Sequence, residues 1–338
     1  MSQNMNVLVT GGAGYIGSHA ILALQDSGYT PIAIDNLSTG SRFGVAPSVP
    51  LEIGDIADIE FVERTVRKYK IDAVMHFAAS CIVPESVEKP LAYYHNNAVN
   101  SVGLVDACIR LGVRNFIFSS TAAVYGVPDR LPVDEETTCR PINPYGWSKL
   151  FTERVLQDAH VAHDLRYVIL RYFNVAGADP QGRAGQRGRT NTHLIKVACE
   201  TAFQKRPSLS IFGTDFPTAD GTGMRDYVHV SDLAAAHVLA LKHLSSGGDS
   251  RIFNCGYGHG YSVREVIEAV ERVSGKRLPV IIEARRPGDP AALVANSDRI
   301  REILGWIPRF DNIEAIIRSA LDWERQLGSE ASAPEGSS

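Results

Sequence analysis

The chain has 338 residues, of which 44% are hydrophobic and 21% are charged, and its formal net charge is −4. This composition is typical of a soluble globular protein with an ample core, and the lack of a basic block argues against nucleic-acid binding. The five cysteines are widely spaced without a C-x-x-C pair, which argues against a disulfide framework or a zinc site and favours free thiols in the cytoplasm. A polar N-terminus and the lack of a long apolar run predict neither a signal peptide nor a membrane span.

Short apolar runs alternate with helical periodicity through the first half of the chain. Strands are expected at residues 7–9, 31–34, 51–53, 73–77, 116–118 and 168–170. Helices are expected at residues 16–24, 59–70, 93–111 and 148–161. Strands that alternate with helices imply right-handed crossovers, so we predict an α/β fold with a Rossmann-like, doubly wound parallel sheet.

Beyond residue 174 this alternation breaks. The stretch 177–192 is rich in Gly, Arg and Gln, and it is too long for an ordinary loop, which predicts a functional role. Short strands at 210–212 and 280–283, with helices at 194–204 and 263–273, predict a smaller α/β domain capping the carboxyl edge of the sheet. The small, polar residues 329–338 predict a disordered tail.

A glycine motif at the first strand–helix junction predicts a dinucleotide site. Gly11, Gly14 and Gly17 allow a tight turn and close backbone approach, and the helix N-terminus can receive a pyrophosphate. Asp35 ends the next strand about 20 residues further on, where an acid binds both ribose hydroxyls and repels a 2′-phosphate. The nearest cation, Arg42, lies several residues downstream. We therefore predict NAD rather than NADP.

Tyr145 and Lys149 form the candidate catalytic pair. Four residues apart on a helix, they project from one face, and Pro144 suits the first turn of that helix. A cation one turn away is expected to lower the tyrosine's pKa from about 10, which would make the phenol a usable base. Thr121 ends a predicted strand at the carboxyl edge of the sheet, where its hydroxyl can meet a bound substrate.

With these parts together, the chain resembles the extended short-chain dehydrogenase/reductase family over about residues 5 to 325. Within that family it is most similar to the epimerases that interconvert UDP-galactose and UDP-glucose. The matching segments are 11–17, 35–37, 76–79, 94–97, 118–126, 145–149, 171–174, 220–229 and 285–289. The resemblance implies reversible, NAD-dependent oxidation at C4 of the sugar, through a 4-keto intermediate.

The resemblance also implies roles for individual residues. Tyr145 would be the base, Lys149 its electrostatic partner and a ligand of the nicotinamide ribose, and Thr121 a hydrogen-bond donor to the sugar's O4. Besides the catalytic pair, the implied cofactor-binding residues are Gly11, Gly14, Tyr15, Ile16, Gly17, Asp35, Asn36, Asp55, Ile56, Phe77, Ala78, Ala79, Asn96 and Phe173. The implied substrate-binding residues are Thr121, Asn174, His193, Leu194, Arg225, Arg286 and Asp289. No metal is expected, and Phe173 could equally be an ordinary core aromatic.

The expected domain division follows from these roles. Residues 1–174, with a return segment at about 227–256, would bind NAD, and residues 175–226 with 257–328 would bind the UDP-sugar. Asp226 and His229 are expected to orient the return of the chain into the sheet. The resemblance further implies a homodimer that buries residues 93–111 and 148–161.

Ala122 and Ala123 separate this chain from the family's dehydratases, which carry an Asp-Glu pair there. Without a carboxylate, the acid/base that eliminates water is missing, so the chemistry should stop at a ketone. Three positions depart from better-known members: Cys81 at a cofactor contact, His193 near the diphosphate, and Leu293 where the side chain influences whether an N-acetyl group fits. Leu293, and a Thr at position 121 that epimerases of UDP-xylose and UDP-arabinose share, leave the sugar open. A UDP-xylose/UDP-arabinose or UDP-N-acetylhexosamine 4-epimerase remains an alternative, and a non-catalytic dinucleotide sensor is the alternative from a different class.

Overall fold

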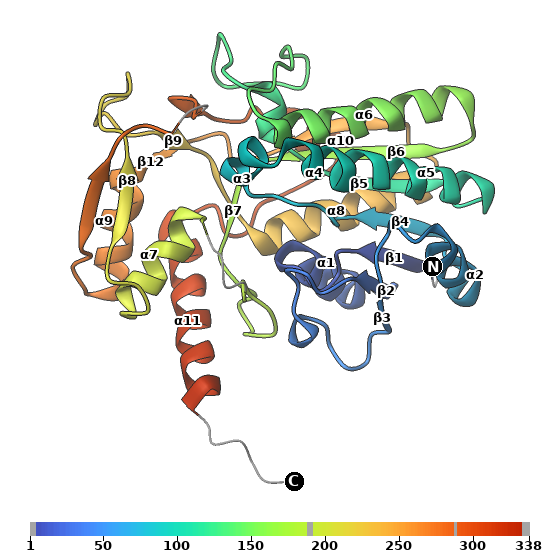
Figure 1. Cartoon of the computed structure of the whole chain (residues 1–338), viewed down its shortest axis with the longest axis horizontal. Coiled ribbons are helices and arrows are strands. Elements are labelled where there is room, and N and C mark those ends of the chain that lie inside the picture. The colour runs from blue at the N-terminus through green and yellow to red at the C-terminus, as the bar shows by residue number, and fades with distance from the viewer. Residues whose placement is uncertain (1–4, 188–191, 287–288, 333–338) are drawn as a thin grey trace.

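The protein, described here from a computed structural model covering residues 5–187, 192–286 and 289–332, is built around one parallel sheet (Figure 1). The sheet has seven strands in the order β11-β6-β5-β4-β1-β2-β3, and all neighbours run parallel. In chain order they are β1 (Asn6–Thr10), β2 (Thr30–Asp35), β3 (Leu51–Ile53), β4 (Ala73–His76), β5 (Asn115–Thr121), β6 (Arg166–Tyr172) and β11 (Arg251–Cys255). The predicted Rossmann-like fold class is confirmed.

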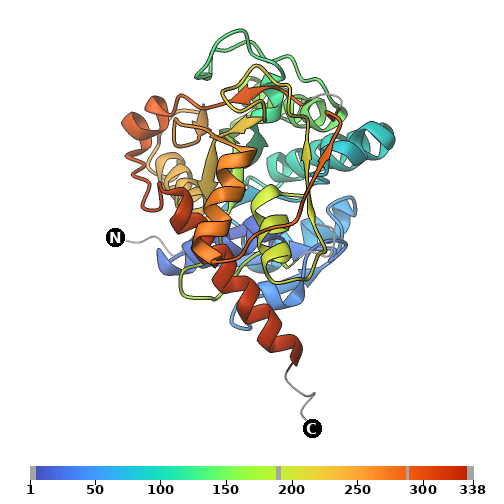
Figure 2. The same ribbon diagram turned by 90° about the vertical axis from the view of Figure 1, so that its left-hand side faces the viewer.

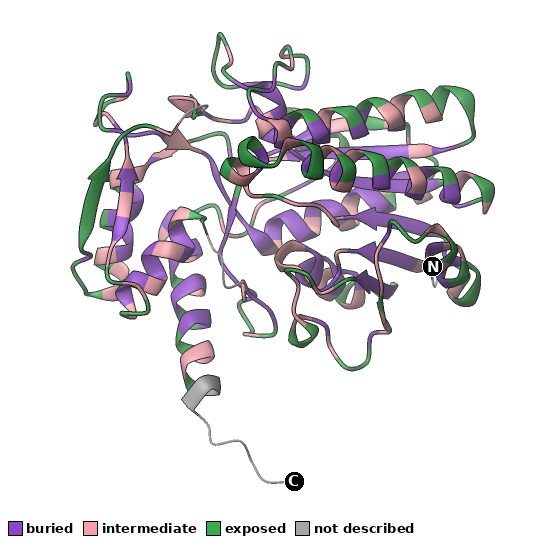
Figure 3. Ribbon diagram, in the orientation of Figure 1, coloured by how far each residue is buried: buried purple, intermediate pink, exposed green. Residues whose placement is uncertain are grey.

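Helices cover both faces of the sheet, and most of the strands between them are buried (Figure 3). One face carries α1 (Tyr15–Asp26) and α8 (Val230–Ser245), and the other α2 (Ile59–Tyr69), α5 (Asn100–Arg110) and α6 (Pro144–Ala162). Because side chains alternate along a strand, Ile117 of β5 joins the α1/α8 cluster while Phe116 and Phe118 join the other. The parallel sheet is therefore buried on both faces, as its apolar strands predict.

A smaller part lies beside the carboxyl ends of the strands. It contains a parallel pair, a three-stranded sheet and three helices: β8 (Leu209–Phe212) with β13 (Val280–Glu283), β9 (Met224–Arg225) with β12 (Tyr261–Ser262) and β14 (Ala292–Leu293), and α7 (Leu194–Ala202), α9 (Val263–Ser274) and α11 (Ile313–Ser332). Figure 2 shows α7, α9 and α11 side by side.

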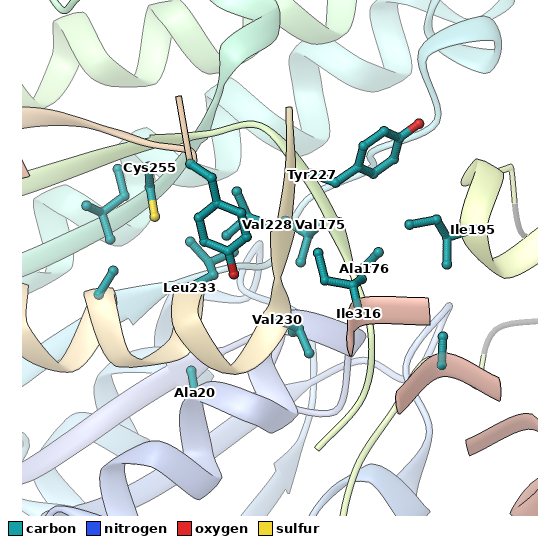
Figure 4. Close-up of a cluster of buried hydrophobic side chains, with 14 of the residues drawn as sticks. Ala20, Val175, Ala176, Ile195, Tyr227, Val228, Val230, Leu233, Cys255 and Ile316 are labelled. Carbon is teal, nitrogen blue, oxygen red and sulfur yellow. The ribbon is translucent and has the colours of Figure 1, made fainter. Parts of the chain in front are cut away.

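The two parts share one hydrophobic core. Figure 4 shows Ala20 of α1, Val230 of α8 and Ile316 of α11 in a single cluster. A second parallel pair, β7 (Asn174–Ala176) with β10 (Tyr227–His229), joins the parts, and α10 (Asp298–Leu304) packs on α8. The remaining short elements are η1 (Arg42–Gly44), α3 (Val83–Glu88), α4 (Pro90–Tyr93), η2 (Tyr94–Val99) and η3 (Ala122–Tyr125).

Two expectations about local structure were wrong. The helix expected at 93–111 is interrupted by η2, a π-helical turn, before α5 begins at Asn100. The tail expected to be disordered from residue 329 is helical as far as Ser332, because α11 is anchored through Glu324 to α7 and adding turns to an anchored helix costs little. Residues 333–338 of the predicted tail, and residues 188–191 of the long loop, lie outside the described residues.

The described part of that long loop, residues 177–187 and residue 192, forms no helix or strand. In the described ranges, no helix is both long and apolar enough to cross a membrane.

Candidate active site

The glycine turn after β1 brings its backbone close to neighbouring segments and leads directly into the N-terminus of α1. A Cβ at Gly11, whose φ is +69°, would lie 2.7 Å from the Ala78 nitrogen, and one at Gly17 would lie 2.2 Å from the Gly11 carbonyl oxygen. Gly14 is the N-cap of α1, and no side chain among the described residues caps that end. The first N–H groups of α1 are therefore available to a pyrophosphate.

Acidic side chains line the neighbouring strand ends. Asp35 is buried, and its two carboxylate oxygens accept the N–H groups of Ala13 (2.9 Å) and Leu37 (2.8 Å). Burial raises the pKa of Asp35, and the backbone hydrogen bonds oppose that rise. Asn36 donates to Asp55 Oδ2 at 2.8 Å, so the structure brings three polar residues from the predicted cofactor set, Asp35 included, to one edge of the sheet. A carboxylate in this position fits the ribose hydroxyls of NAD.

Other predicted cofactor residues surround the same turn. Tyr15 donates its hydroxyl proton to the Gly177 carbonyl (2.6 Å). Ile16 is half-buried in α1, and Ile56 is buried after β3. The half-buried residues after β4 are Phe77, Ala78 and Ala79.

An asparagine that sequence reasoning missed fixes the loop after β4. Asn97 of η2 donates to the Ser80 carbonyl (2.9 Å) and to Ser148 Oγ (3.0 Å), and it accepts the Ser80 N–H (2.8 Å). Asn96, which was predicted to bind the cofactor, donates to Ser80 Oγ (3.0 Å). The Asn-Asn pair was visible in the sequence, but the π-helical turn that points Asn97 at this loop was not.

Tyr145 and Lys149 project together from α6 toward β5, as their spacing predicts. Asn143 caps the helix by accepting the Gly146 N–H (2.8 Å), and Pro144 is its first residue. Tyr145 is 7% exposed and Lys149 3%. The Lys149 ammonium donates to the Ser119 carbonyl at 2.9 Å.

Burial dominates the electrostatics of the pair. Burial raises the pKa of Tyr145 well above its ordinary value, and a hydrogen bond with Thr121 opposes this only in part. Burial also lowers the pKa of Lys149 from 10.5 to about 8. In the free protein, desolvation of the phenolate therefore dominates the pKa of Tyr145, and the lowering by Lys149 that the spacing predicts stays a prediction.

Two further residues lie near the pair: Tyr172, which was not predicted to be a site residue, and Cys81, which was noted only as a departure from better-known members. The Tyr172 hydroxyl accepts from Ser119 Oγ at 3.0 Å, and a negative charge on Tyr172 would raise the pKa of Tyr145 further. Tyr172 stands opposite Thr121 in the β5–β6 register, so the order of strands could have revealed it. Cys81 is exposed, yet its surroundings desolvate the thiol and raise its pKa.

The predicted substrate residues gather in the smaller part. Arg225 of β9 lies 3.4 Å from Asp289 Oδ1, and Arg286 stacks its guanidinium 3.5 Å from the centre of the Phe212 ring. Phe212 was not predicted; a half-exposed aromatic beside a cation offers a flat surface for a base. Nothing in the strand pattern at 210–212 pairs this ring with Arg286, which comes from a distant segment.

The remaining predicted residues lie at element boundaries. Asn174 begins β7, His193 precedes α7 with Nδ1 3.1 Å from Gln186 Nε2, and Leu194 begins α7. Phe173 is buried in a hydrophobic cluster with Leu293, so its packing role is visible and a nicotinamide contact stays a prediction.

The segment in which the chain returns toward the central sheet is held by hydrogen bonds from backbone N–H groups to two side chains. Asp226 accepts N–H groups from Tyr257, Gly258 and Ala295 (2.9 to 3.2 Å), and His229 accepts the Ser231 N–H at the start of α8. No cluster of three or more His, Cys, Asp or Glu residues in the described ranges could hold a metal ion.

Comparison with known proteins identifies the family. The model of the NAD dependent epimerase/dehydratase family matches residues 7–256. A UDP-glucose 4-epimerase of Azospirillum brasilense is 58% identical over 334 residues, covering 98% of this chain and 96% of the relative. The structure of a UDP-glucose 4-epimerase from Brucella ovis in complex with NAD superposes with a TM-score of 0.91 at 46% identity, covering 94% of this chain and 98% of that one.

A UDP-glucose 4-epimerase from Bifidobacterium longum, in complex with NAD⁺ and UDP, also has a TM-score of 0.91, at 39% identity over 95% of this chain and 98% of that one. The family model spans most of the chain, and the relatives match it from end to end. The chain belongs to the NAD dependent epimerase/dehydratase family.

Proposed function

We propose that this protein is an NAD-dependent UDP-glucose 4-epimerase, which interconverts UDP-galactose and UDP-glucose through a 4-keto sugar. The observation that carries the proposal is the buried Tyr145–Lys149 pair at the carboxyl end of β5, beside a glycine turn that fits a dinucleotide. The names of its full-length relatives support the same activity.

Cofactor binding follows from the strand ends. The N-terminus of α1 would bind the pyrophosphate, and Asp35 the adenosine ribose, which leaves the nicotinamide end toward η2 and α6. When bound, NAD⁺ supplies the hydride acceptor and a positive charge in a pocket where burial otherwise favours neutral groups. Residues 1–174 and about 227–256 make up the proposed NAD-binding domain.

Tyr145 and its neighbours handle the proton. Tyr145 takes the proton from the sugar's O4, while Thr121 hydrogen-bonds that oxygen. Lys149, held at the Ser119 carbonyl, supplies the positive charge that the phenolate needs. Because burial raises the phenol's pKa in the free protein, the base must form after the substrate and cofactor have entered.

The turn after Thr121 restricts the fate of the ketone. η3 places Ala122 and Ala123 there, and methyl groups cannot abstract a proton from C5. The ketone is therefore reduced again rather than dehydrated. Reduction on the opposite face inverts C4 when the sugar has turned about its bond to the diphosphate.

The sugar can rotate within the site only if the UDP group stays tightly bound. Arg225 and Arg286 are the proposed diphosphate ligands, since guanidinium binds phosphate in bidentate geometry. Asp289 is the proposed ribose ligand, and it pairs with Arg225 in the free protein. Residues 175–226 and 257–328 make up the proposed substrate domain.

A homodimeric assembly and a cytoplasmic location are also part of this proposal. Apolar residues on the outer face of η2, α5 and α6 are 38% to 55% exposed, as an interface between two copies would require: Val99, Val102, Trp147 and Phe151. Five free cysteines favour the cytoplasm.

The test is to incubate the purified protein with UDP-galactose, UDP-xylose and UDP-GlcNAc, without added cofactor, and to follow 4-epimer formation. We expect UDP-glucose from UDP-galactose, and only NAD(H) released on denaturation. Turnover restricted to one of the other two sugars would reassign the substrate, and no turnover of any would refute an epimerase. Tyr145→Phe should lose several orders of magnitude in kcat and keep its bound cofactor.

A further inference from the structure

The buried face of α6 carries a third ionisable residue in register with the catalytic pair. Tyr145, Lys149 and Glu153 follow one another at four-residue intervals, and Glu153 is 1% exposed. A carboxylate is rarely buried this completely unless it is paired. The proposed proton transfer gives Glu153 no role.

Glu153 is clamped to two neighbouring strands. Its Oε1 accepts from Ser120 Oγ (2.5 Å) and from Arg171 Nε (3.1 Å), and its Oε2 accepts from Arg171 Nη2 (2.6 Å). Ser120 of β5 and Arg171 of β6 stand opposite each other in the register of the sheet. The carboxylate therefore fixes α6 against both strands at one point.

The same strand contacts the catalytic pair. Ser119 accepts the Lys149 ammonium through its carbonyl, and Thr121 hydrogen-bonds Tyr145. Three consecutive residues of β5 thus meet three consecutive turns of α6. A slip of the helix at Glu153 would move both catalytic groups relative to Thr121.

Arg171 is held from its other side as well. Its Nη1 donates to the Tyr125 hydroxyl (3.1 Å), which donates to Asn254 Oδ1 (2.6 Å). Asn254 donates its N–H to Glu135 Oε1 (2.8 Å). These partners are buried, so the arginine cannot turn away from Glu153 without leaving several polar groups unsatisfied.

Among the residues that the structure describes, few other charges act on Lys149. The groups whose charges interact with it are His76 of β4, Cys81 of the loop after β4, and Glu153. Burial lowers the pKa of His76 to about 3 and raises that of Cys81, so both are neutral near pH 7. Glu153, paired with Arg171, is then the negative charge that favours the ammonium.

We propose that Glu153 is a positioning residue for the C4 oxidation: held by Arg171 and Ser120, it fixes α6 on β5 and keeps a negative charge one helical turn from Lys149. The inference rests on the proposed function, because Lys149 matters to the chemistry only where Tyr145 is the base.

The experiment follows the titration of Lys149 directly. Protein labelled with ¹³C at lysine Cε is titrated by NMR, and the Lys149 signal is assigned by its loss in Lys149→Met. In Glu153→Gln, we expect the pKa of Lys149 to fall by roughly one pH unit, because its favourable charge is gone and Arg171 is left unpaired. The ammonium is then lost at lower pH, so the alkaline limb of the kcat profile should move down with it.

A double variant, Glu153→Gln with Arg171→Met, removes both charges and keeps the test open where the single variant does not fold. It should still lower the pKa of Lys149 by a measurable amount, but by less than half as much as Glu153→Gln. An unchanged Lys149 titration in either folded variant would overturn the proposal.

Glu324→Gln is the matched control. Glu324 is a buried carboxylate of α11 that pairs with Lys196, away from the catalytic pair. It should lose thermal stability and leave the Lys149 titration unchanged; a shift equal to that of Glu153→Gln would also overturn the proposal. Because the titration needs no turnover, failure of the epimerase assay is a separate result.

Discussion

Acid should destabilise this protein through a histidine buried beneath the glycine turn. His76 ends β4 and is 1% exposed, with Nδ1 2.6 Å from Thr10 Oγ1 and Nε2 2.8 Å from Ser101 Oγ. The Ser101 hydroxyl donates to the Asn97 carbonyl, so its oxygen is left to accept from Nε2–H, and Thr10 donates to Nδ1. Both ring nitrogens of a neutral imidazole are thereby satisfied.

A second proton on the ring would face the Thr10 hydroxyl in a pocket close to the Lys149 ammonium. Burial, with that charge, lowers the pKa of His76 from 6.5 to about 3. Between pH 6.5 and about 3, His76 is protonated in the unfolded chain but neutral in the native state. The free energy of unfolding therefore decreases as the pH falls through this range. Linkage gives a loss of about 2 kcal/mol between pH 7 and pH 5 from this residue alone.

The assay is urea unfolding at pH 7 and pH 5 for wild type, His76→Gln and His163→Gln. We expect His76→Gln to be less stable at both pH values, since it loses packing, but to lose about 2 kcal/mol less than wild type on acidification. His163 is exposed, and its variant should follow wild type. An equal pH-dependent loss in His76→Gln and wild type would refute the reasoning.

Three further changes test the turn, the interface and the long loop. Gly17→Ala places a methyl group 2.2 Å from the Gly11 carbonyl oxygen, so the NAD(H) released from the purified protein should drop about tenfold or more while circular dichroism stays native. Phe151→Asp puts a charge on the proposed dimer face and should give a monomer by light scattering; an unchanged dimer would move the interface elsewhere. Arg183→Ala removes the bidentate pair with Asp26 (3.0 Å) that fastens the loop to α1, and should cost about 1 kcal/mol and weaken UDP binding several-fold by calorimetry.

Features that depend on neighbouring residues were predictable from the sequence. The strand at 51–53 and the start of the helix at residue 59 were placed correctly, because apolar spacing and turn residues are local signals. The parallel order followed from the alternation of strands and helices. Pro144 likewise marked the first residue of α6.

Features that depend on distant segments were not predictable. The stacking of Arg286 on Phe212 joins β8 to the chain beyond β13, and the sequence carries no register between those segments. The π-helical turn η2 takes the place of part of an expected α-helix. In this turn Asn97 contacts Ser80 and Ser148, and these contacts exist only in the assembled fold. Secondary-structure propensity and hydrophobic periodicity do not predict such contacts.

The electrostatics of Tyr145 and Lys149 show why spacing alone could not predict the state of the site. Spacing supplies the attraction between a phenolate and an ammonium, whereas the fold decides how far both are desolvated, and here burial favours the neutral form of each. Loss of the phenol's proton beside the Lys149 ammonium creates an ion pair, so the polar groups that bind its two ends decide whether the phenolate forms. The ends of that pair face Ser119 and Thr121 of β5, and Glu153 sets the register in which they meet. Whether Tyr145 can act as a base therefore depends on how α6 packs on β5. The Glu153 variants test this packing more directly than substitutions of Tyr145 or Lys149 do.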